Sequence, residues 1–395
     1  MTGDKTRRVL SLSTLWPQAA NPRGGIFVAR SMEALQRRTH WQVVTIAPRA
    51  RPPLPFGRRV ADTGASERSA SGAEVHRPSY SVLPRVGGRL APGAILRAVL
   101  PLARRLHEET PFDLVAAQTF YPDGPAAARI AAELGLPLSA KARGADIHHW
   151  GARSYGREAL LATAGRARGI LAVSEALAED MAALGIERRR IAVHYTGLDR
   201  DRFRPLDHPQ LRTTLARELD LPLTNGEPLL LSVGALTERK GQDLVLRALP
   251  GLPEARLLLV GTGEEAGPLA KLAQGIGVAD RVHFLGAVDH YLLPPLLSAA
   301  DVMVLPSAAE GLANVWIESL ACGTPLVVCD AGGAREVVTG PLAGRIVARS
   351  VRGVGEGIAR VLACPRERQA VAATVARFSW DAHAAGLAAH YDGLL

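Results

Sequence analysis

The chain has 395 residues, of which 47% are hydrophobic and 22% charged, and it carries a formal net charge of +9 at pH 7. This length predicts two domains, and the ordinary composition excludes disordered, collagen-like and coiled-coil proteins. Three cysteines do not make a disulfide framework and indicate a reducing compartment, and no apolar run reaches the ~20 residues of a membrane span.

The positive charge is concentrated at the start of the chain. The first 110 residues contain 18 Lys and Arg against 7 Asp and Glu, so the remainder is nearly balanced. Such an excess suits nucleic acid, an anionic membrane surface or phosphorylated substrates. No aromatic residues interleave with these arginines as in a nucleic-acid platform. We therefore expect an anionic membrane surface as a partner, and no nucleic acid.

Short apolar runs alternate with helix-like segments, a pattern typical of α/β proteins with parallel sheets. The first run, interrupted by Ser11 and Ser13, predicts a strand rather than a secretory leader. The strands and the clearest helices predicted in the first half are 8–13, 26–38 (helix), 42–47, 114–117, 125–134 (helix), 138–142, 169–173 and 191–194. The stretch from 52 to 92, rich in Pro, Gly, Ser and Arg, predicts long loops or a flexible insertion.

A second series of strands begins near residue 228. Its predicted strands are 229–233, 256–260, 282–284, 302–305 and 326–328. The proline-rich residues 200–227 mark the seam between the two halves, and a capped helix is expected after Ser379. The chain is thus expected to hold two doubly wound domains. Such sheets bind ligands at the carboxyl ends of their strands, and two of them facing each other make a cleft.

The strongest local signal is PSAAEGLANVWIESLACGTPLVV, residues 306–328. Glu310 falls in the loop after a predicted strand, and Glu318 lies about one turn into the helix that begins near Asn314. The loop exposes backbone N–H groups at a helix N-terminus, where phosphates bind well. A loop carboxylate can accept hydrogen bonds from sugar hydroxyls, and a helix carboxylate can take the two hydroxyls of a ribose. The alternative is a surface helix whose Glu only favours the helix dipole.

The second signal is LLLSVGALTERKGQDLVLRAL, residues 229–249. A buried strand ends at Gly234, and Arg239 and Lys240 stand just before the next helix. A lysine here can reach a diphosphate as a point charge, supported by the helix N-terminus. The alternative is a solvated lysine near a turn.

Two further segments follow strands of the first half. Gly24 and Gly25 occupy a strand-to-helix turn, where glycine lets the backbone approach a ligand closely, although plain turns of this kind are common. Arg143 and Asp146 close the strand 138–142 and are expected to point toward the cleft. The adjacent histidines at 148–149 do not share a helix face and have no supporting cluster, so we expect no metal site.

One motif resembles a dinucleotide-binding pattern but stands in the wrong place for one. Residues 260–266 satisfy the G-x-G-x-x-G/A dinucleotide pattern, with Asp280 further on. The pattern sits after the second strand of its half, whereas the dinucleotide fingerprint belongs to a first βα turn. We therefore expect no NAD site.

Taken together and in order, these segments resemble the family-4 glycosyltransferases of the GT-B fold. The resemblance spans most of the chain and includes, besides the segments above, VSE at 173–175, YTGLD at 195–199, FLG at 284–286, AD at 300–301, ACGTP at 321–325 and the glycines at 332–333 with Glu336. The opening Trp16-Pro17 and residues 25–28 look most like the branch that builds bacterial exopolysaccharide, capsule or lipopolysaccharide.

The resemblance implies an N-terminal acceptor domain at 1–205, a nucleotide-sugar donor domain at 206–375 and a C-terminal helix, 376–395, that packs back toward the first domain. Family members retain the anomeric configuration and need neither metal nor cofactor. The resemblance implies site residues with the following roles: Lys240 on the diphosphate, Glu318 on the ribose, Glu310 on a hydroxyl of the transferred sugar, backbone N–H groups of Leu312, Ala313 and Asn314 on phosphate and sugar, Gly25 near the diphosphate, and Arg143 and Asp146 on the acceptor side.

The chain departs from the family pattern at two positions. Many members carry Arg after the glycine of the VG element, where this chain has Ala235, and Arg239 is the candidate substitute. Many members carry His where this chain has Arg143, so no single general acid or base is named. The donor's own phosphate oxygen could take the acceptor proton.

The sequence leaves other functions open. A nucleotide-sugar epimerase of the same architecture would act without an acceptor, and a non-catalytic relative would only bind nucleotide or glycan. The expected acceptor is a glycan or a polyprenyl-linked sugar, and the expected location is the cytoplasm, at the inner face of the membrane. The sugar, the base and the linkage are not readable from the sequence.

Overall fold

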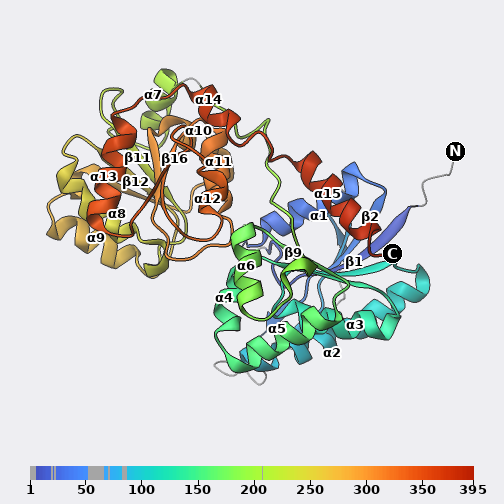
Figure 1. Cartoon of the computed structure of the whole chain (residues 1–395). Helices are drawn as coiled ribbons and strands as arrows, with labels where there is room; N and C mark the ends of the chain where they lie inside the picture. Colours follow the sequence, from blue (N-terminus) through green and yellow to red (C-terminus); the bar gives the residue numbers. More distant parts are fainter. Residues whose placement is uncertain are drawn as a thin grey trace. The chain divides into compact units, whose positions relative to one another are not determined.

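The computed structural model describes residues 6–18, 21, 24–51, 66–69, 72–81, 87–206 and 208–395, the side chains of 208–210 excepted. It divides into two compact units, each with its own parallel sheet (Figure 1). The first unit combines Met1–Gly197 with Trp380–Leu395, and the second is Leu198–Ser379. The chain therefore passes between units at 197/198 and 379/380, where the sequence had placed its boundaries at 205/206 and 375/376.

The first unit is built on an eight-stranded sheet in the order β10-β9-β8-β7-β1-β2-β5-β4, parallel except for the edge pair β4–β5. Its strands are β1 (Arg7–Leu12), β2 (Trp41–Ile46), β4 (Ser66–Arg68), β5 (Glu74–His76), β7 (Leu114–Ala117), β8 (Leu138–Ala142), β9 (Gly169–Ala172) and β10 (Ile191–Val193); β3 (Arg49–Arg51) pairs separately with β6 (Ser79–Ser81). Its helices are α1 (Ile26–Arg38), α2 (Gly87–Glu109), α3 (Asp123–Leu134), α4 (Ala145–Gly151), α5 (Ser154–Arg166), α6 (Glu175–Ala183) and α15 (Trp380–Asp392).

The stretch 52–92 was predicted as loops, and this prediction is wrong for much of its described part. Residues 66–68, 74–76 and 79–81 are strands, and α2 begins at Gly87 and contains both Pro92 and Pro101. Five apolar residues at spacings of three or four bury one face of α2, and this packing outweighs the two prolines: Ala91, Ile95, Val99, Ala103 and Leu106. Residues 52–65, 70–71 and 82–86 lie outside the described part.

The second unit has a six-stranded, wholly parallel sheet in the order β13-β12-β11-β14-β15-β16. Its strands are β11 (Leu229–Val233), β12 (Arg256–Val260), β13 (Val282–Gly286), β14 (Val302–Leu305), β15 (Leu326–Cys329) and β16 (Gly344–Val347). Its helices are α7 (His208–Glu218), α8 (Gln242–Ala248), α9 (Ala266–Gly275), α10 (Leu293–Ala299), α11 (Asn314–Ala321), α12 (Ala334–Val337), α13 (Val351–Leu362) and α14 (Arg368–Ala373). This is the Rossmann strand order, and it confirms the predicted doubly wound architecture.

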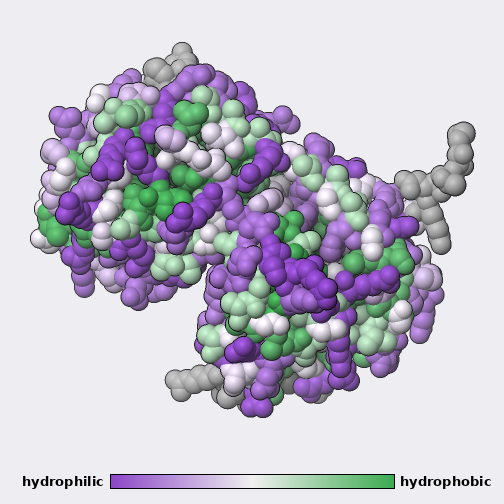
Figure 2. All heavy atoms as spheres, viewed as in Figure 1, coloured by the Kyte–Doolittle hydropathy of each residue, from purple (hydrophilic) through white to green (hydrophobic). Residues whose placement is uncertain are grey.

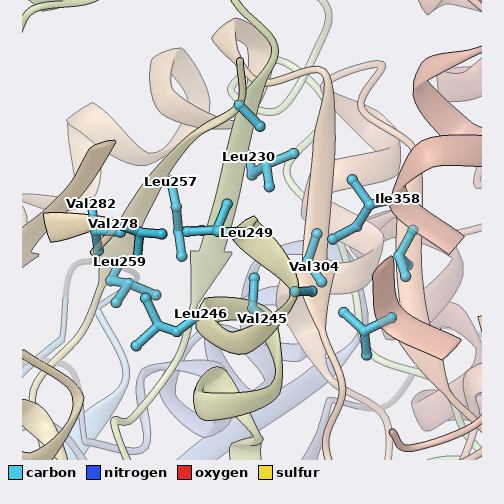
Figure 3. Close-up of a cluster of buried hydrophobic side chains, with 14 of the residues drawn as sticks. Leu230, Val245, Leu246, Leu249, Leu257, Leu259, Val278, Val282, Val304 and Ile358 are labelled. Carbon is cyan, nitrogen blue, oxygen red and sulfur yellow. The ribbon is translucent and has the colours of Figure 1, made fainter. Parts of the chain in front are cut away.

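Aliphatic side chains from both layers of the second unit fill its core (Figure 3). Val245, Leu246 and Leu249 from α8 and its end meet Leu230, Leu257 and other strand residues, and all are fully buried. Each such side chain stabilises the fold by about 1.5–3 kcal/mol relative to exposure. The strands read as continuous apolar runs because helices cover both faces of a parallel sheet. Polar side chains cover most of the outer face that Figure 2 presents.

Helix α15 returns to the first unit and lies against α1, which confirms the predicted final helix (Figure 1). Leu387 and Tyr391 join the buried cluster that contains Val28 and Met32 of α1. At the end of α15, Asp392 Oδ1 accepts hydrogen bonds from Arg7, His40 and Trp41, as the distances of 2.6, 3.1 and 3.1 Å show.

A buried group of bases also holds α15. His383 Nδ1 donates to the Tyr195 carbonyl at 2.8 Å, so its Nε2 accepts from Ser31 Oγ at 2.6 Å. His194 Nε2 donates to the His383 carbonyl at 2.9 Å, so its Nδ1 accepts from Lys141 Nζ at 2.7 Å. Burial, followed by the charge of Lys141, lowers the pKa of both imidazoles, so both are neutral in the folded unit.

Candidate functional site

The switch point of the second sheet lies between β11 and β14, because β12 flanks β11 on one side and β14 on the other. Ligands of doubly wound sheets bind outside the carboxyl ends of the strands at such a point. The two segments singled out in the sequence follow these two strands. Their charged residues, 70 positions apart in the chain, therefore meet at one edge of the sheet.

Lys240 and Glu310 form the centre of this site. Lys240 Nζ lies 2.5 Å from Glu310 Oε1, and the Arg239 guanidinium is 3.5 Å from the same oxygen. The side chains of Lys240 and Glu310 are only 13% and 10% exposed, whereas that of Arg239 is 50% exposed. One carboxylate thus faces two cations in a partly dry environment, where electrostatic interactions are stronger than in water.

The two loops that carry this cluster are joined through their backbones. The Ala308 N–H donates to the Arg239 carbonyl at 2.8 Å, and Arg239 Nη1 donates to the Ala309 carbonyl. A Cβ on Gly241 would lie 2.6 Å from the Pro306 carbonyl oxygen, so only glycine permits this approach. These contacts hold the two loops that carry the cations and the carboxylate against each other.

Arg349, which the sequence analysis did not single out, also joins these loops. It follows β16, and its guanidinium donates to the carbonyls of Pro306 and Glu238 at 3.1 Å each. The prediction missed it because β16 itself was not predicted, so nothing indicated that a basic residue near 349 returns to this edge.

Helix α11 begins at Asn314, as predicted, directly after the Glu310 loop. Its N-cap residue is Ala313, whose methyl group cannot accept a hydrogen bond, so the helix has no side-chain cap. The first amides of the helix therefore suit an anion. Glu318 lies half-buried on the second turn of α11. The predicted roles of Leu312, Ala313, Asn314 and Glu318 stay predictions.

The glycines of the G-x-G-x-x-G/A pattern at 260–266 have a packing role. A Cβ on Gly261 would lie 1.8 Å from the Gly234 carbonyl oxygen, and one on Gly263 would lie 2.1 Å from that of Leu236. The Leu236 N–H donates to the Thr262 carbonyl at 2.9 Å. These glycines let the β12 loop pack closely against the β11 loop, and the expected absence of an NAD site stays a prediction.

In the first unit, Asp146 and Arg143 follow β8 at the carboxyl edge of the sheet. Asp146 Oδ2 accepts from the Phe120 amide at 2.7 Å, and Oδ1 accepts from the amides of Arg143 and Gly144 at 2.9 Å each. Burial nevertheless raises the pKa of Asp146. Both oxygens thus hold the loops after β7 and β8, and the predicted acceptor-side role of Asp146 stays a prediction.

Arg143 is turned toward the interior of its unit. Its Nε donates to the Gln118 carbonyl at 2.6 Å, and its guanidinium carbon lies 4.9 Å from the ring centre of Phe27. Burial lowers the pKa of Arg143 to about 10, which keeps it charged at neutral pH. Arg143 is therefore a cation in the folded unit, and its predicted acceptor-side role stays a prediction.

The remaining predicted features of the first unit are simple to locate. Gly25 is the N-cap residue of α1, in the left-handed region at φ 73°; Pro22 and Arg23 lie outside the described residues. His148 Nε2 pairs with Asp180 at 2.8 Å. Among the described residues, no group of three or more His, Cys, Asp or Glu is arranged to hold a metal ion. Within the same residues, no helix is long and apolar enough to cross a bilayer.

The two sheets and the cation–carboxylate site define a two-domain Rossmann-like protein of the GT-B type. Two family profiles match its halves in turn: "Glycosyltransferase Family 4" over residues 24–202 and "Glycosyl transferases group 1" over residues 219–377. Together with the fold, these matches support a glycosyltransferase of the GT-B fold.

A D-inositol 3-phosphate glycosyltransferase of Mycobacterium tuberculosis is 34% identical over 220 residues, covering 52% of this chain and 44% of that protein. The chain thus spans about half the length of the curated relative it matches. A sucrose-phosphate synthase from Thermosynechococcus elongatus has a TM-score of 0.80 at 21% identity, covering 98% and 99% of the two chains. The Anabaena protein HepE, solved with UDP and glucose, has a TM-score of 0.72 at 21% identity, covering 96% and 98%.

Proposed function

We propose that this protein is a retaining, metal-independent glycosyltransferase that moves a sugar from a nucleoside diphosphate to a glycan or polyprenyl-linked acceptor in bacterial surface polysaccharide synthesis. The contact of Lys240 and Arg239 with Glu310, at the carboxyl ends of β11 and β14, carries the proposal. HepE is solved with UDP and glucose, so UDP and its sugars are the first donors to test.

In this proposal, Lys240 neutralises charge on the diphosphate as the bond between sugar C1 and the phosphate oxygen breaks. The charge grows in the transition state, so a fixed ammonium lowers the barrier more than it tightens ground-state binding. Arg239 supplies a second cation, in place of the arginine that many family members carry where this chain has Ala235. Its 3.5 Å approach to Glu310 Oε1 supports this role.

Glu310 binds a hydroxyl of the transferred sugar through Oε2, because both cations contact Oε1. Glu318 binds the ribose hydroxyls, and the backbone amides of Leu312, Ala313 and Asn314 face phosphate and sugar. The acceptor hydroxyl forms its bond to C1 on the face that the diphosphate leaves. Its proton passes to a phosphate oxygen of the leaving group, so no protein base is needed and the charges balance.

The first test compares Lys240→Ala with Lys271→Ala, a matched control because Lys271 is an exposed lysine on α9 of the same unit. UDP, GDP, ADP and their sugars are screened by thermal shift, since a ligand that binds only the folded state raises Tm by mass action. One nucleotide should raise Tm in wild type and in Lys271→Ala, and much less in Lys240→Ala.

With the donor known, Lys240→Ala should lower kcat/KM about 10²–10³-fold, the effect of removing one transition-state charge contact. Turnover within a few-fold of wild type would show that Lys240 does not stabilise the leaving group. Release of an epimer or free sugar with no acceptor present would overturn the transferase assignment in favour of an epimerase.

Membrane association is part of the proposal and rests on charge. The exposed face of α2 carries Arg89 and Arg97 beside Leu90, which is 50% exposed. Cytoplasmic anionic lipid attracts such a surface. Wild type should float with anionic vesicles and not with neutral ones, and Arg89→Glu with Arg97→Glu should abolish flotation, whereas Arg217→Glu on α7 should not. Equal partitioning to both vesicles would refute this part.

A further inference from the structure

Asp123 is a fully buried carboxylate at the switch point of the first sheet, and the proposed chemistry does not use it. It is the first residue of α3. Its two oxygens lie 3.1 and 3.2 Å from the backbone N–H of Thr14, and Thr119 Oγ1 donates to Oδ2 at 2.9 Å. Thr14 follows β1 and Thr119 follows β7. One carboxylate therefore ties together the ends of the two strands between which the strand order reverses.

The segment that Asp123 holds at Thr14 continues into residues that pack against Gly25. A Cβ on Gly25 would lie 2.3 Å from the carbonyl carbon of Leu15 and 2.6 Å from the Trp16 nitrogen, so the N-cap of α1 rests on the residues next to Thr14. Trp16 is 6% exposed and packs in the cluster that holds Val28 of α1. The residues that follow Thr14 therefore pack against Gly25 and share a buried cluster with the first turn of α1.

The Asp123 carboxyl group changes its charge near neutral pH. Burial raises its pKa to about 7, against the lowering effect of the hydrogen bonds from Thr14 and Thr119. The titratable groups that face it are Asp146 after β8, whose charge raises the pKa further, Arg143 on the same connection, and Tyr80 of β6.

We propose that Asp123 is a positioning residue whose ionised carboxylate holds the Thr14 amide, and through it the Gly25 turn at the start of α1. An ionised acceptor forms a stronger hydrogen bond than a neutral one. When Asp123 is protonated, its hold on the Thr14 amide weakens, and a hydroxyl that donated to the carboxylate, that of Thr14 or of Thr119, turns from donor to acceptor. The loop is therefore held more tightly above neutral pH than below it.

Asp123→Asn tests this, because the amide has the shape of the protonated acid: Oδ1 can accept from Thr14 and Nδ2 can donate to Thr119. Asp113→Asn is the matched control. Asp113 Oδ2 accepts from the Arg8 amide at 2.7 Å, at the opposite edge of the same sheet. Circular dichroism checks that both variants fold.

Hydrogen exchange of the Thr14–Trp16 amides is measured at pH 6 and pH 8, and proteins are compared at each pH so that intrinsic rates cancel. At pH 8 the Asp123→Asn amides should exchange about 5-fold faster than wild type, the difference between a charged and a neutral hydrogen bond. At pH 6 the two should agree, and Asp113→Asn should match wild type throughout. Equal exchange of Asp123→Asn and wild type at pH 8 would overturn the inference.

Discussion

Gly332 packs closely against the backbone of the loop that carries Glu310. It lies at φ +50°, and a Cβ there would sit 2.2 Å from the Glu310 carbonyl oxygen and 2.7 Å from that of Gly311. The Gly333 amide also donates to the Gly311 carbonyl at 2.9 Å. Since carbon and oxygen atoms keep about 3.3 Å apart even in close contacts, Gly332→Ala must push the Glu310 backbone away by about 1 Å.

Two costs add in this variant. An alanine in the left-handed region loses about 1–2 kcal/mol of stability, and the forced displacement adds about 1–3 kcal/mol. A 1 Å misplacement of a positioned group can cost on the order of 100-fold in rate, so activity should fall by about that factor. Gly277→Ala is the matched control: Gly277 is also left-handed, at φ +71°, but no atom lies within 4 Å of its added Cβ. It should show the strain cost alone and keep full activity.

The assay is urea unfolding followed by circular dichroism, paired with transfer rate or, before the donor is known, with the nucleotide-induced rise in Tm. Gly332→Ala should lose at least twice the stability that Gly277→Ala loses. If the two variants lose equal stability and both keep activity, the packing of Gly332 does not set the position of Glu310.

Two further predictions concern stability. Burial lowers the pKa of His194 and His383, so the unfolded chain binds more protons in acid than the folded chain does. The first unit should therefore lose up to about 1.4 kcal/mol of stability per pH unit for each imidazole as pH falls below about 6.5. In urea unfolding from pH 8 to 5, the stability of His383→Gln should fall less steeply with pH than that of wild type, and an equal fall would contradict the buried network. Arg212 is 2% exposed, pairs with Asp301 at 2.6 Å and also donates to three backbone carbonyls, so Arg212→Met should cost about 3–5 kcal/mol. The control variant Arg352→Ala, at an exposed position, should unfold at the same urea concentration as wild type. If Arg212→Met also unfolds at the wild-type urea concentration, the Arg212–Asp301 pair does not stabilise the protein.

Local signals predicted much of the fold. Helix 26–38 and strands 114–117, 229–233, 256–260 and 302–305 have the observed bounds, because an apolar run flanked by glycine, proline or charge is sufficient to define a buried strand in a parallel sheet. Lys240 and Glu310 were also identified separately, each by its place after a strand. In contrast, α2 was missed because its start lies in the stretch 52–92, whose Pro, Gly, Ser and Arg content predicted loops. The apolar face that stabilises the helix has value only when another layer covers it.

What the sequence determined by itself is therefore the alternation of strands and helices, the two halves, and the residue types available for chemistry. Only the tertiary structure decided how those residues are used. Lys240 and Glu310 meet because the strand order reverses between β11 and β14, a fact that no local window contains. Asp146 and Asp123 have both oxygens occupied by backbone or side-chain donors because distant loops pack on them. Spacing along the chain predicts most of the buried strands, whereas a charged group's role depends on which neighbours burial brings to it.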